Sequence, residues 1–306
     1  MSSLKNLGQN VSGIACPVRR PIKKRERQLL YYPPGHFYSP IVDPLQADQY
    51  ILEIEARQTP ESLDGIAIDR TAMRQTWQKL VPLIESSPFR EKASGPFRYA
   101  LENPYYSWGD GNVLQAMIRH YRPRRIIEIG SGWSSACICD TVEHFLYGAS
   151  ELTFIEPHPE RLRRLLGTSA SKAGITILEC NVQQTNLDIF EHLEGGDFLF
   201  IDSSHVLRTG GDVCHELFEI LPRLASGVVV HIHDIFWPFE YPRQWVVNEN
   251  RSWNEIYAVR AFLTHNDRWD IVMFNSYMAL VERDLIAHTY PDFSKRPPGA
   301  IWLQRR

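Results

Sequence analysis

Three polar residues with chemically useful side chains stand at the ends of apolar stretches. Asp202 directly follows one such stretch, and His233 and Asp234 follow another. Two carboxylates and an imidazole can hold a divalent cation, because aspartate oxygens suit Mg²⁺ and an imidazole extends the choice to Mn²⁺, Fe²⁺ or Zn²⁺. In the alternative interpretation no cation binds, the two acids are hydrogen-bonded to loops, and His233 or His205 serves as a general base. We therefore treat His233, Asp202 and Asp234 as candidate catalytic residues and as candidate metal ligands.

A second group of residues has the spacing of a ligand-binding turn. The run Ile126-Ile127-Glu128-Ile129-Gly130-Ser131-Gly132 joins an apolar stretch to a helical pattern over 136–145. A strand, a glycine turn and a helix in this order leave backbone N–H groups free at the helix N-terminus, and glycine avoids side chains that would block a ligand. A dinucleotide fingerprint needs a third glycine where Ser135 stands, which argues against NAD.

Glu156 is the acidic residue that completes this pattern. It stands at the end of the next apolar stretch, 152–155, somewhat more than 20 positions beyond the glycine turn. A carboxylate at this place can accept hydrogen bonds from both hydroxyls of a ribose, since its two oxygens take donors side by side. A surface glutamate preceding Pro157 is the simpler alternative, but the joint spacing with the glycine turn favours the ribose role.

The acid-x-Gly-x-Gly pattern resembles motif I of the class I S-adenosylmethionine (SAM) methyltransferases. This resemblance implies that Glu128 helps to hold the amino-acid end of SAM and that Asn181 contacts the adenine. The loop Ser107-Trp108-Gly109-Asp110 is similar to a loop that lies over SAM in catechol-type O-methyltransferases, so Trp108 either covers the cofactor or fills the core. The expected cofactor-binding residues are Trp108, Glu128, Gly130, Ser131, Gly132, Ser135, Glu156, Asn181 and Asp202.

Two acidic residues in the C-terminal half, Asp202 and Asp234, resemble the metal ligands of metal-dependent small-molecule O-methyltransferases. Asp202 and Asp234 match ligand positions after the fourth and fifth strands of that group. Catechol-type enzymes have Asp-Asn at the second position, whereas Ile235 follows Asp234 here. Related sugar and antibiotic methyltransferases have an acidic pair, which His233-Asp234 resembles with histidine as the first member. The resemblance implies SAM and a divalent metal (Mg, Mn or Fe), with the need for metal left open.

Short apolar stretches that alternate with helical segments must position these residues. This alternation predicts an α/β fold with a doubly wound, Rossmann-like sheet, and strands that are apolar throughout are typical of a parallel sheet buried on both faces. Ligands of such sheets bind beyond the carboxyl ends of the strands, where all the candidate residues converge. A seventh strand inserted antiparallel is what the class I resemblance implies. The expected strands are 126–129, 152–155, 175–178, 198–201, 227–232, 269–274 and 299–303.

The pattern also predicts how the chain is divided. Residues 1–28 contain a basic run and are expected to form a flexible arm. Residues 29–100, with helices expected over about 44–58 and 70–86, are interpreted as an N-terminal helical cap, and 101–306 as the catalytic domain. Ser252 and Glu255 fit a capping box that opens a helix ending near residue 265.

Composition sets broad limits on function. The 306 residues are 43% hydrophobic and 23% charged, with a net charge of −3. This composition gives no indication of a nucleic-acid or membrane partner. No signal-like apolar region stands at the N-terminus, and the five cysteines lack a C-x-x-C pattern. We therefore expect a cytoplasmic protein with reduced thiols.

These observations favour a SAM-dependent methyltransferase of a biosynthetic pathway that acts on a small-molecule acceptor, with metal assistance at the sheet edge. Three alternatives remain: a SAM enzyme with different chemistry, such as intramolecular alkylation, a non-catalytic SAM-binding module, and an NAD oxidoreductase. The oligomeric state is open, and a homo-oligomer is compatible with the sequence.

Overall fold

The computed structural model describes residues 31–168 and 174–306. The chain divides into two units, of which the larger comprises 55–242 and 253–306. The smaller one contains helix α2 (Pro44–Glu55, the last residue of which belongs to the larger unit) and the segment 243–252 with the π-helical turn η5 (Gln244–Asn248). Within it, Arg243 Nε donates to Asp48 Oδ1 over 2.6 Å. The basic arm predicted over 1–28 lies outside the described residues.

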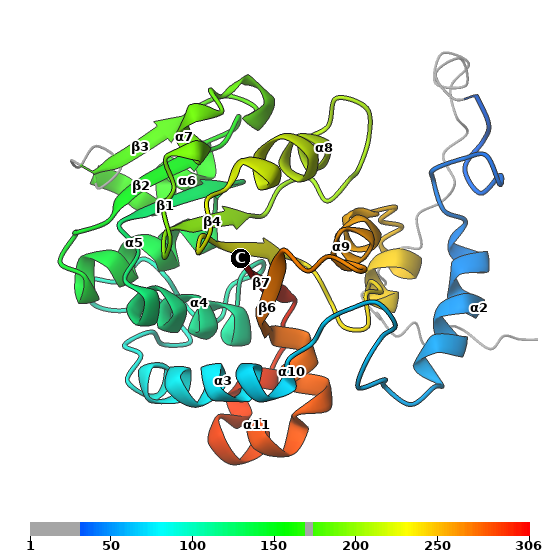
Figure 1. Cartoon of the computed structure of the whole chain (residues 1–306), viewed down its shortest axis with the longest axis horizontal. Helices are drawn as coiled ribbons and strands as arrows, with labels where there is room; N and C mark the ends of the chain where they lie inside the picture. The colour runs from blue at the N-terminus through cyan, green and yellow to red at the C-terminus, as the bar shows by residue number, and fades with distance from the viewer. Residues whose placement is uncertain (1–30, 169–173) are drawn as a thin grey trace, which may run out of the picture. The chain divides into compact units, whose positions relative to one another are not determined.

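A single seven-stranded sheet organises the larger unit (Figure 1). Its strand order is β3-β2-β1-β4-β5-β7-β6, with β7 antiparallel to both β5 and β6. The predicted doubly wound fold, with an antiparallel seventh strand, is therefore confirmed. The strands are β1 (Arg125–Ile129), β2 (Glu151–Ile155), β3 (Ile175–Leu178), β4 (Phe198–Ile201), β5 (Val229–His233), β6 (Trp269–Phe274) and β7 (Ala300–Arg305).

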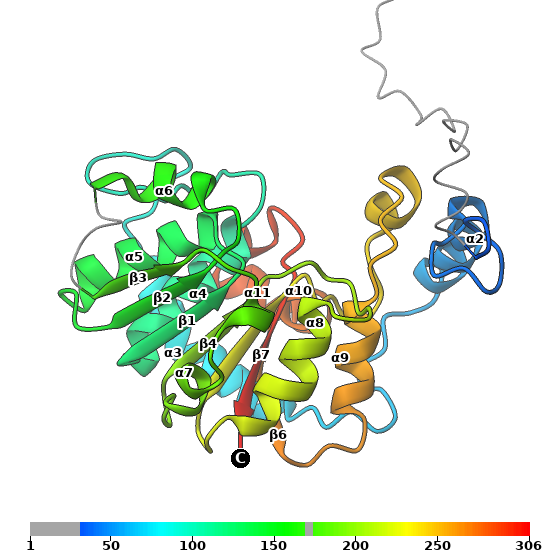
Figure 2. The same cartoon turned by 90° about the horizontal axis from the view of Figure 1, so that it is seen from above.

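Helices cover both faces of this sheet. Figure 2 shows α4 and α5 on one face and α8 and α9 on the other. Every residue of β4 and β5 is buried, as expected for parallel strands covered on both sides. The helices of the larger unit are α3 (Arg70–Glu85), α4 (Trp108–Tyr121), α5 (Trp133–Phe145), α6 (Glu160–Leu166), α7 (Asp188–Glu191), α8 (Asp212–His215), α9 (Glu255–Leu263), α10 (Asn275–Val281) and α11 (Arg283–Thr289), with short 3-10 or π turns at Val182–Gln184, Glu216–Ile220, Leu221–Arg223 and Pro291–Ser294.

The predicted division at residue 101 differs from the division in the structure. Helix α3 packs against α4 and β6 and belongs to the larger unit. Its apolar face buries Met73, Trp77, Leu80 and Ile84, and the indole of Trp77 donates to Thr289 Oγ1 over 2.9 Å. The periodicity correctly predicted an apolar stripe, but periodicity alone does not say which element covers that stripe.

The capping box predicted at Ser252 is wrong. Helix α9 begins at Glu255, and its N-cap residue is Asn254. The side chain of Asn254 accepts a hydrogen bond from the Leu207 amide over 2.6 Å, and Glu255 bonds to His205 instead of the helix end. Both side chains therefore fasten α9 to the loop that follows β4.

Among the described residues, no helix combines the length and apolar character needed to cross a bilayer.

Candidate active site

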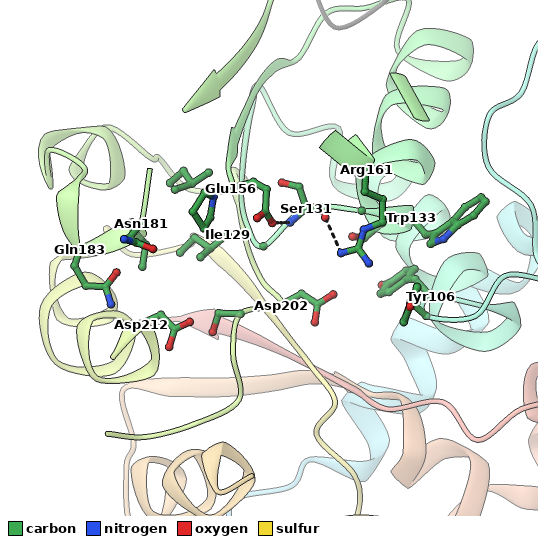
Figure 3. A pocket seen from close by; sticks show the side chains of 18 of the residues that line it. Tyr106, Ile129, Ser131, Trp133, Glu156, Arg161, Asn181, Gln183, Asp202 and Asp212 are labelled. Atoms are coloured by element: carbon green, nitrogen blue, oxygen red, sulfur yellow. Dashed lines mark hydrogen bonds between the residues drawn. The ribbon is translucent and has the colours of Figure 1, made fainter. Parts of the chain in front are cut away.

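A cavity of about 320 Å³ opens at the carboxyl ends of β1, β2 and β4 (Figure 3). Strand register explains this position. Ile129 pairs with Ile155 of β2 and with Ile201 of β4, so the residues that follow, Gly130, Glu156 and Asp202, lie at one level. The chain leaves β1 toward β2 on one side and returns at β4 on the other, which creates the crevice typical of doubly wound sheets.

Six of the nine predicted cofactor-binding residues line this cavity, namely Gly130, Ser131, Gly132, Glu156, Asn181 and Asp202. Further residues line the cavity that are not among the site residues predicted from the sequence, namely Tyr105, Tyr106, Trp133, Arg161, Gln183, Arg208 and Asp212. Tyr105 and Tyr106 immediately precede the Ser107-Trp108 loop, so the resemblance indicated the correct loop but the wrong aromatic side chain.

Gly130 is required by a close approach of two backbone segments. Its φ is +77°, and a Cβ atom here would lie 1.9 Å from the carbonyl oxygen of Asp202. This differs from the expectation that a side chain would mainly block a ligand. A larger residue would displace the loop after β4, so a substitution at Gly130 disturbs the turn as well as the cavity.

Glu128 does not line the cavity, which corrects its predicted contact with the cofactor. The carboxyl is fully buried and accepts hydrogen bonds from the hydroxyls of Ser134 and Ser135 in the first turn of α5. Burial raises its pKa to about 8, and the two hydroxyl donors only partly oppose that shift. Ser135 also lies outside the lining: its hydroxyl accepts the Gly132 amide over 2.9 Å. Glu128 and Ser135 therefore stabilise the glycine turn by hydrogen bonds without lining the cavity.

Glu156 is held in place by two backbone donors. The amides of Ser131 and His158 donate to its two oxygens, over 3.0 and 2.8 Å. A carboxylate has about four acceptor positions, so each oxygen keeps capacity for a further donor. Ser131 itself has a buried hydroxyl that no group of the described residues satisfies. The cavity thus offers one oriented pair of acceptor oxygens, and the unpaired hydroxyl of Ser131 is buried beside it.

Trp108 is buried at the start of α4 and is absent from the cavity lining, so the cofactor-covering role predicted for it is not supported. The Lys295 ammonium lies 3.7 Å from the centre of its ring. The packing interpretation, which the sequence left open, fits this position. Asp110, two residues later, accepts from Asn275 over 2.7 Å and from the Gly299 amide over 3.0 Å.

Asp202, His233 and Asp234 come together, as their strand positions predict. Each offers one ligand atom, and these atoms all lie within 4.8 Å of one another. His233 Nδ1 is 3.2 Å from Asp202 and 3.5 Å from Asp234. Ile201 at the end of β4 is in register with Ile232 of β5. The residues that follow, Asp202 and His233, therefore lie beside each other at the edge of the sheet.

His205 joins this group, although the sequence suggested it only as an alternative base. Its Nε2 lies 3.4 Å from an oxygen of Asp202 and 3.4 Å from an oxygen of Asp234. Both His205 and Asp234 have left-handed backbone, with φ of 60° and 56°. Such conformations cost free energy in non-glycine residues and are frequent at functional sites. The turn at His205 directs its ring toward β5, which spacing in the sequence does not reveal.

The cluster is strongly polarised. Burial opposes charge on its members, but neighbouring carboxylates outweigh burial and raise the pKa of His205 and of His233 well above the ordinary value. The two imidazoles in turn hold the pKa of Asp202 below its usual range, although burial opposes that shift. This edge of the sheet therefore favours positive charge, supplied by protons on the rings or by a bound cation.

Comparison with known proteins agrees with this geometry. Residues 127–235 match the model of a methyltransferase domain family. The chain is 30% identical over 166 residues to an uncharacterized protein of Archaeoglobus fulgidus, which corresponds to 53% of this chain and 74% of that protein.

Solved structures of methyltransferases align with most of this chain, but with low sequence identity and low TM-scores. The SAH-bound methyltransferase PaMTH1 of Podospora anserina has a TM-score of 0.41 at 16% identity, covering 86% of this chain and 96% of that one. A putative O-methyltransferase from Klebsiella pneumoniae has a TM-score of 0.43 at 14% identity, with 85% and 96% covered.

The seven-stranded sheet and its edge cavity define a class I methyltransferase fold. The sequence matches show that the chain belongs to the methyltransferase family. The prediction that it is a class I, SAM-dependent methyltransferase is confirmed. It is an enzyme of the transferase class, which sets aside the NAD oxidoreductase and the non-catalytic module.

Proposed function

We propose that the protein transfers the methyl group of SAM to an oxygen of a small-molecule acceptor, with a divalent cation assisting at the Asp/His cluster. The observation that carries this proposal is the position of Asp202. This residue lines the 320 Å³ cavity and also belongs to the group Asp202, His233 and Asp234. A donor in the cavity and an acceptor at the cluster would therefore meet at one side chain, as in-line transfer requires.

The cavity has the layout of a SAM site. Asn181 and Gln183 lie toward one end, Glu156 in the middle, and Trp133, Arg161 and Tyr106 toward the other (Figure 3). We assign the adenine to the first end and the ribose hydroxyls to Glu156. The methionine end then lies beside Ser131, whose hydroxyl is unpaired, and near the N-terminus of α5, where backbone N–H groups favour a carboxylate.

The reaction itself is a displacement at carbon. An electron pair of the acceptor oxygen attacks the methyl carbon, the carbon–sulfur bond breaks, and the sulfur keeps its electrons. The acceptor's proton must leave. In a cluster without a cation, a neutral His233 or His205 would take it, whereas with a cation in place the acceptor would release its proton to solvent. A cation held by Asp202, His233 and Asp234 would lower the pKa of the acceptor oxygen. The donor set fits such an ion, because each of the three side chains offers one ligand atom and these atoms all lie within 4.8 Å of one another.

The donor assignment is tested by calorimetric titration of SAM into the full chain. Glu156→Ala should weaken SAM binding about 10- to 150-fold, which corresponds to roughly 1.5–3 kcal/mol for hydrogen bonds to a charged group. Glu156→Gln keeps the side-chain size and should also weaken binding. Glu160→Ala, which removes an exposed carboxylate outside the cavity lining, serves as the control. Unchanged SAM affinity in a folded Glu156→Ala protein would contradict the ribose role.

The cation is tested by removing it. Turnover is followed by mass spectrometry with methyl-labelled SAM and a panel of hydroxylated small molecules, which also distinguishes methylation from intramolecular alkylation of SAM. A chelator should reduce turnover by orders of magnitude while SAM still binds, and an added divalent ion should restore it. Asp234→Asn, of nearly equal size, should reproduce the loss. Full turnover of metal-free protein in excess chelator would refute metal assistance and favour a lone histidine base.

A further inference from the structure

The two histidines of the cluster are arranged alike. His205 Nε2 and His233 Nδ1 both face the carboxylates of Asp202 and Asp234, at 3.2–3.5 Å. The opposite nitrogen of each ring faces a separate carboxylate. His205 Nδ1 lies 2.8 Å from Glu255, and His233 Nε2 lies 3.8 Å from Asp110. Each ring therefore has one nitrogen that faces Asp202 and Asp234. The other nitrogen of His205 is hydrogen-bonded to Glu255, whereas that of His233 lies near Asp110 beyond hydrogen-bond distance.

For His205, this arrangement is what a metal-binding histidine needs. A carboxylate behind the ring accepts the N–H of one nitrogen and leaves the lone pair of the other nitrogen pointing toward the ion. Glu255 is well suited to this task, because it is almost fully buried and sits at the first position of α9. Asp110 is fixed in turn by the side chain of Asn275 and the amide of Gly299.

The charge of the cluster also calls for a cation. Four buried or largely buried carboxylates, those of Asp110, Asp202, Asp234 and Glu255, surround two imidazoles. Among the described residues, no lysine or arginine forms an ion pair with any of the four. Buried carboxylates need a compensating positive charge, and a divalent ion would compensate two of these charges with both rings neutral.

We propose that His205 is a fourth protein ligand, beside Asp202, His233 and Asp234, and that this two-imidazole, two-carboxylate set selects a divalent transition ion such as Mn²⁺, Fe²⁺ or Co²⁺ over Mg²⁺. Glu255 is the positioning residue for His205. The selectivity follows from ligand chemistry, because Mg²⁺ prefers oxygen ligands and retains its water, whereas imidazole binds the later metals well. The inference rests on the proposed function, since the same cluster would assist methyl transfer.

The test measures metal binding directly, with SAM affinity measured on the same samples. The full chain, stripped by chelator, is titrated with Mn²⁺, Co²⁺ and Mg²⁺, and stoichiometry is confirmed by elemental analysis. We expect one Mn²⁺ or Co²⁺ per chain, bound at least 10-fold more tightly than Mg²⁺. His205→Ala should weaken Co²⁺ binding more than 10-fold, and Glu255→Gln about 10- to 100-fold, the usual range for a group that orients a ligand. His288→Ala, an exposed histidine on α11, should change nothing.

X-ray absorption of the Co²⁺ protein provides a readout that needs no variant, because imidazole scattering counts the histidine ligands. Two imidazoles are expected. One imidazole, Mg²⁺ preferred over Co²⁺, or wild-type Co²⁺ affinity in a folded His205→Ala protein would each overturn the four-ligand site. The same holds if millimolar Co²⁺ fails to bind. If SAM still binds in these cases, the four-ligand metal site is wrong but the assignment of SAM as methyl donor stands. If the wild-type protein does not bind SAM, the proposed function itself is refuted.

Discussion

At the scale of single residues, Glu128 has a different role from the one that its motif suggests. The acidic position of motif I was expected to contact the cofactor, yet here it is buried behind the turn and bonded to Ser134 and Ser135. A buried carboxyl disfavours ionisation, and its pKa of about 8 keeps it neutral near pH 7. The protonation state of Glu128 therefore affects the stability of the folded protein.

The raised pKa of Glu128 makes stability depend on pH in a defined direction. Between the unfolded value of about 4.3 and the folded value of about 8, only the folded chain holds the proton, so the free energy of unfolding falls by about 1.4 kcal/mol per pH unit as pH rises. Glu128→Gln lacks this proton, so it should gain stability relative to wild type from pH 5 to pH 8. Urea denaturation at several pH values measures the difference.

The exposed Glu151, at the start of β2, supplies a matched control for that experiment. Glu151→Gln should follow the wild-type pH profile. Parallel profiles for Glu128→Gln and the wild type would show that the Glu128 carboxyl ionises normally, and would contradict its burial in a neutral form.

At the scale of elements, α3 is anchored to the start of α11 by one buried carboxylate. Glu282 is almost fully buried, pairs with Arg70, and accepts from Arg74 Nε over 2.7 Å. Burial tends to raise its pKa, but the two guanidinium groups outweigh burial and lower it. The stabilisation is therefore present above the unfolded pKa of about 4.3 and is lost as the pH falls through the lower folded value.

Glu282→Gln should consequently lower the free energy of unfolding at pH 7 by about 1–2 kcal/mol, a value reduced for the partial exposure of both arginines. The deficit should shrink as pH falls below about 4. Glu61→Gln removes the exposed partner of Arg70 and should change stability by no more than about 0.5 kcal/mol. A deficit of Glu282→Gln that is equal at pH 7 and at low pH would contradict an ionic anchor.

The sequence predicted the elements well because the buried strands are short, apolar and regularly spaced. All seven strands lie where expected, and the residues after β1, β2 and β4 meet at one edge because parallel strands end together. What escaped prediction depends on side-chain direction and loop backbone. Local spacing does not show that Glu255 turns from a capping role to His205, or that Trp108 packs inward while Tyr106 lines the cavity.

At the scale of the whole molecule, two sites meet at the carboxyl edge of one sheet. The glycine turn and Glu156 border the cavity, and the Asp/His cluster lies at the ends of β4 and β5. Asp202 belongs to both. The central claim is that the cavity holds the methyl donor, so that its methyl group is presented toward the cluster.

Amide hydrogen exchange of the full chain, with and without S-adenosylhomocysteine, tests this claim most directly. Bound ligand should slow exchange in peptides covering 129–135, 155–161, 181–184 and 202–204, which contribute the cavity lining. Peptides of β6, at the far edge of the sheet, serve as the internal reference and should not change. Protection of these cavity segments is the predicted result, whereas saturating ligand that leaves 129–135 and 155–161 unprotected would contradict the assignment of the donor site.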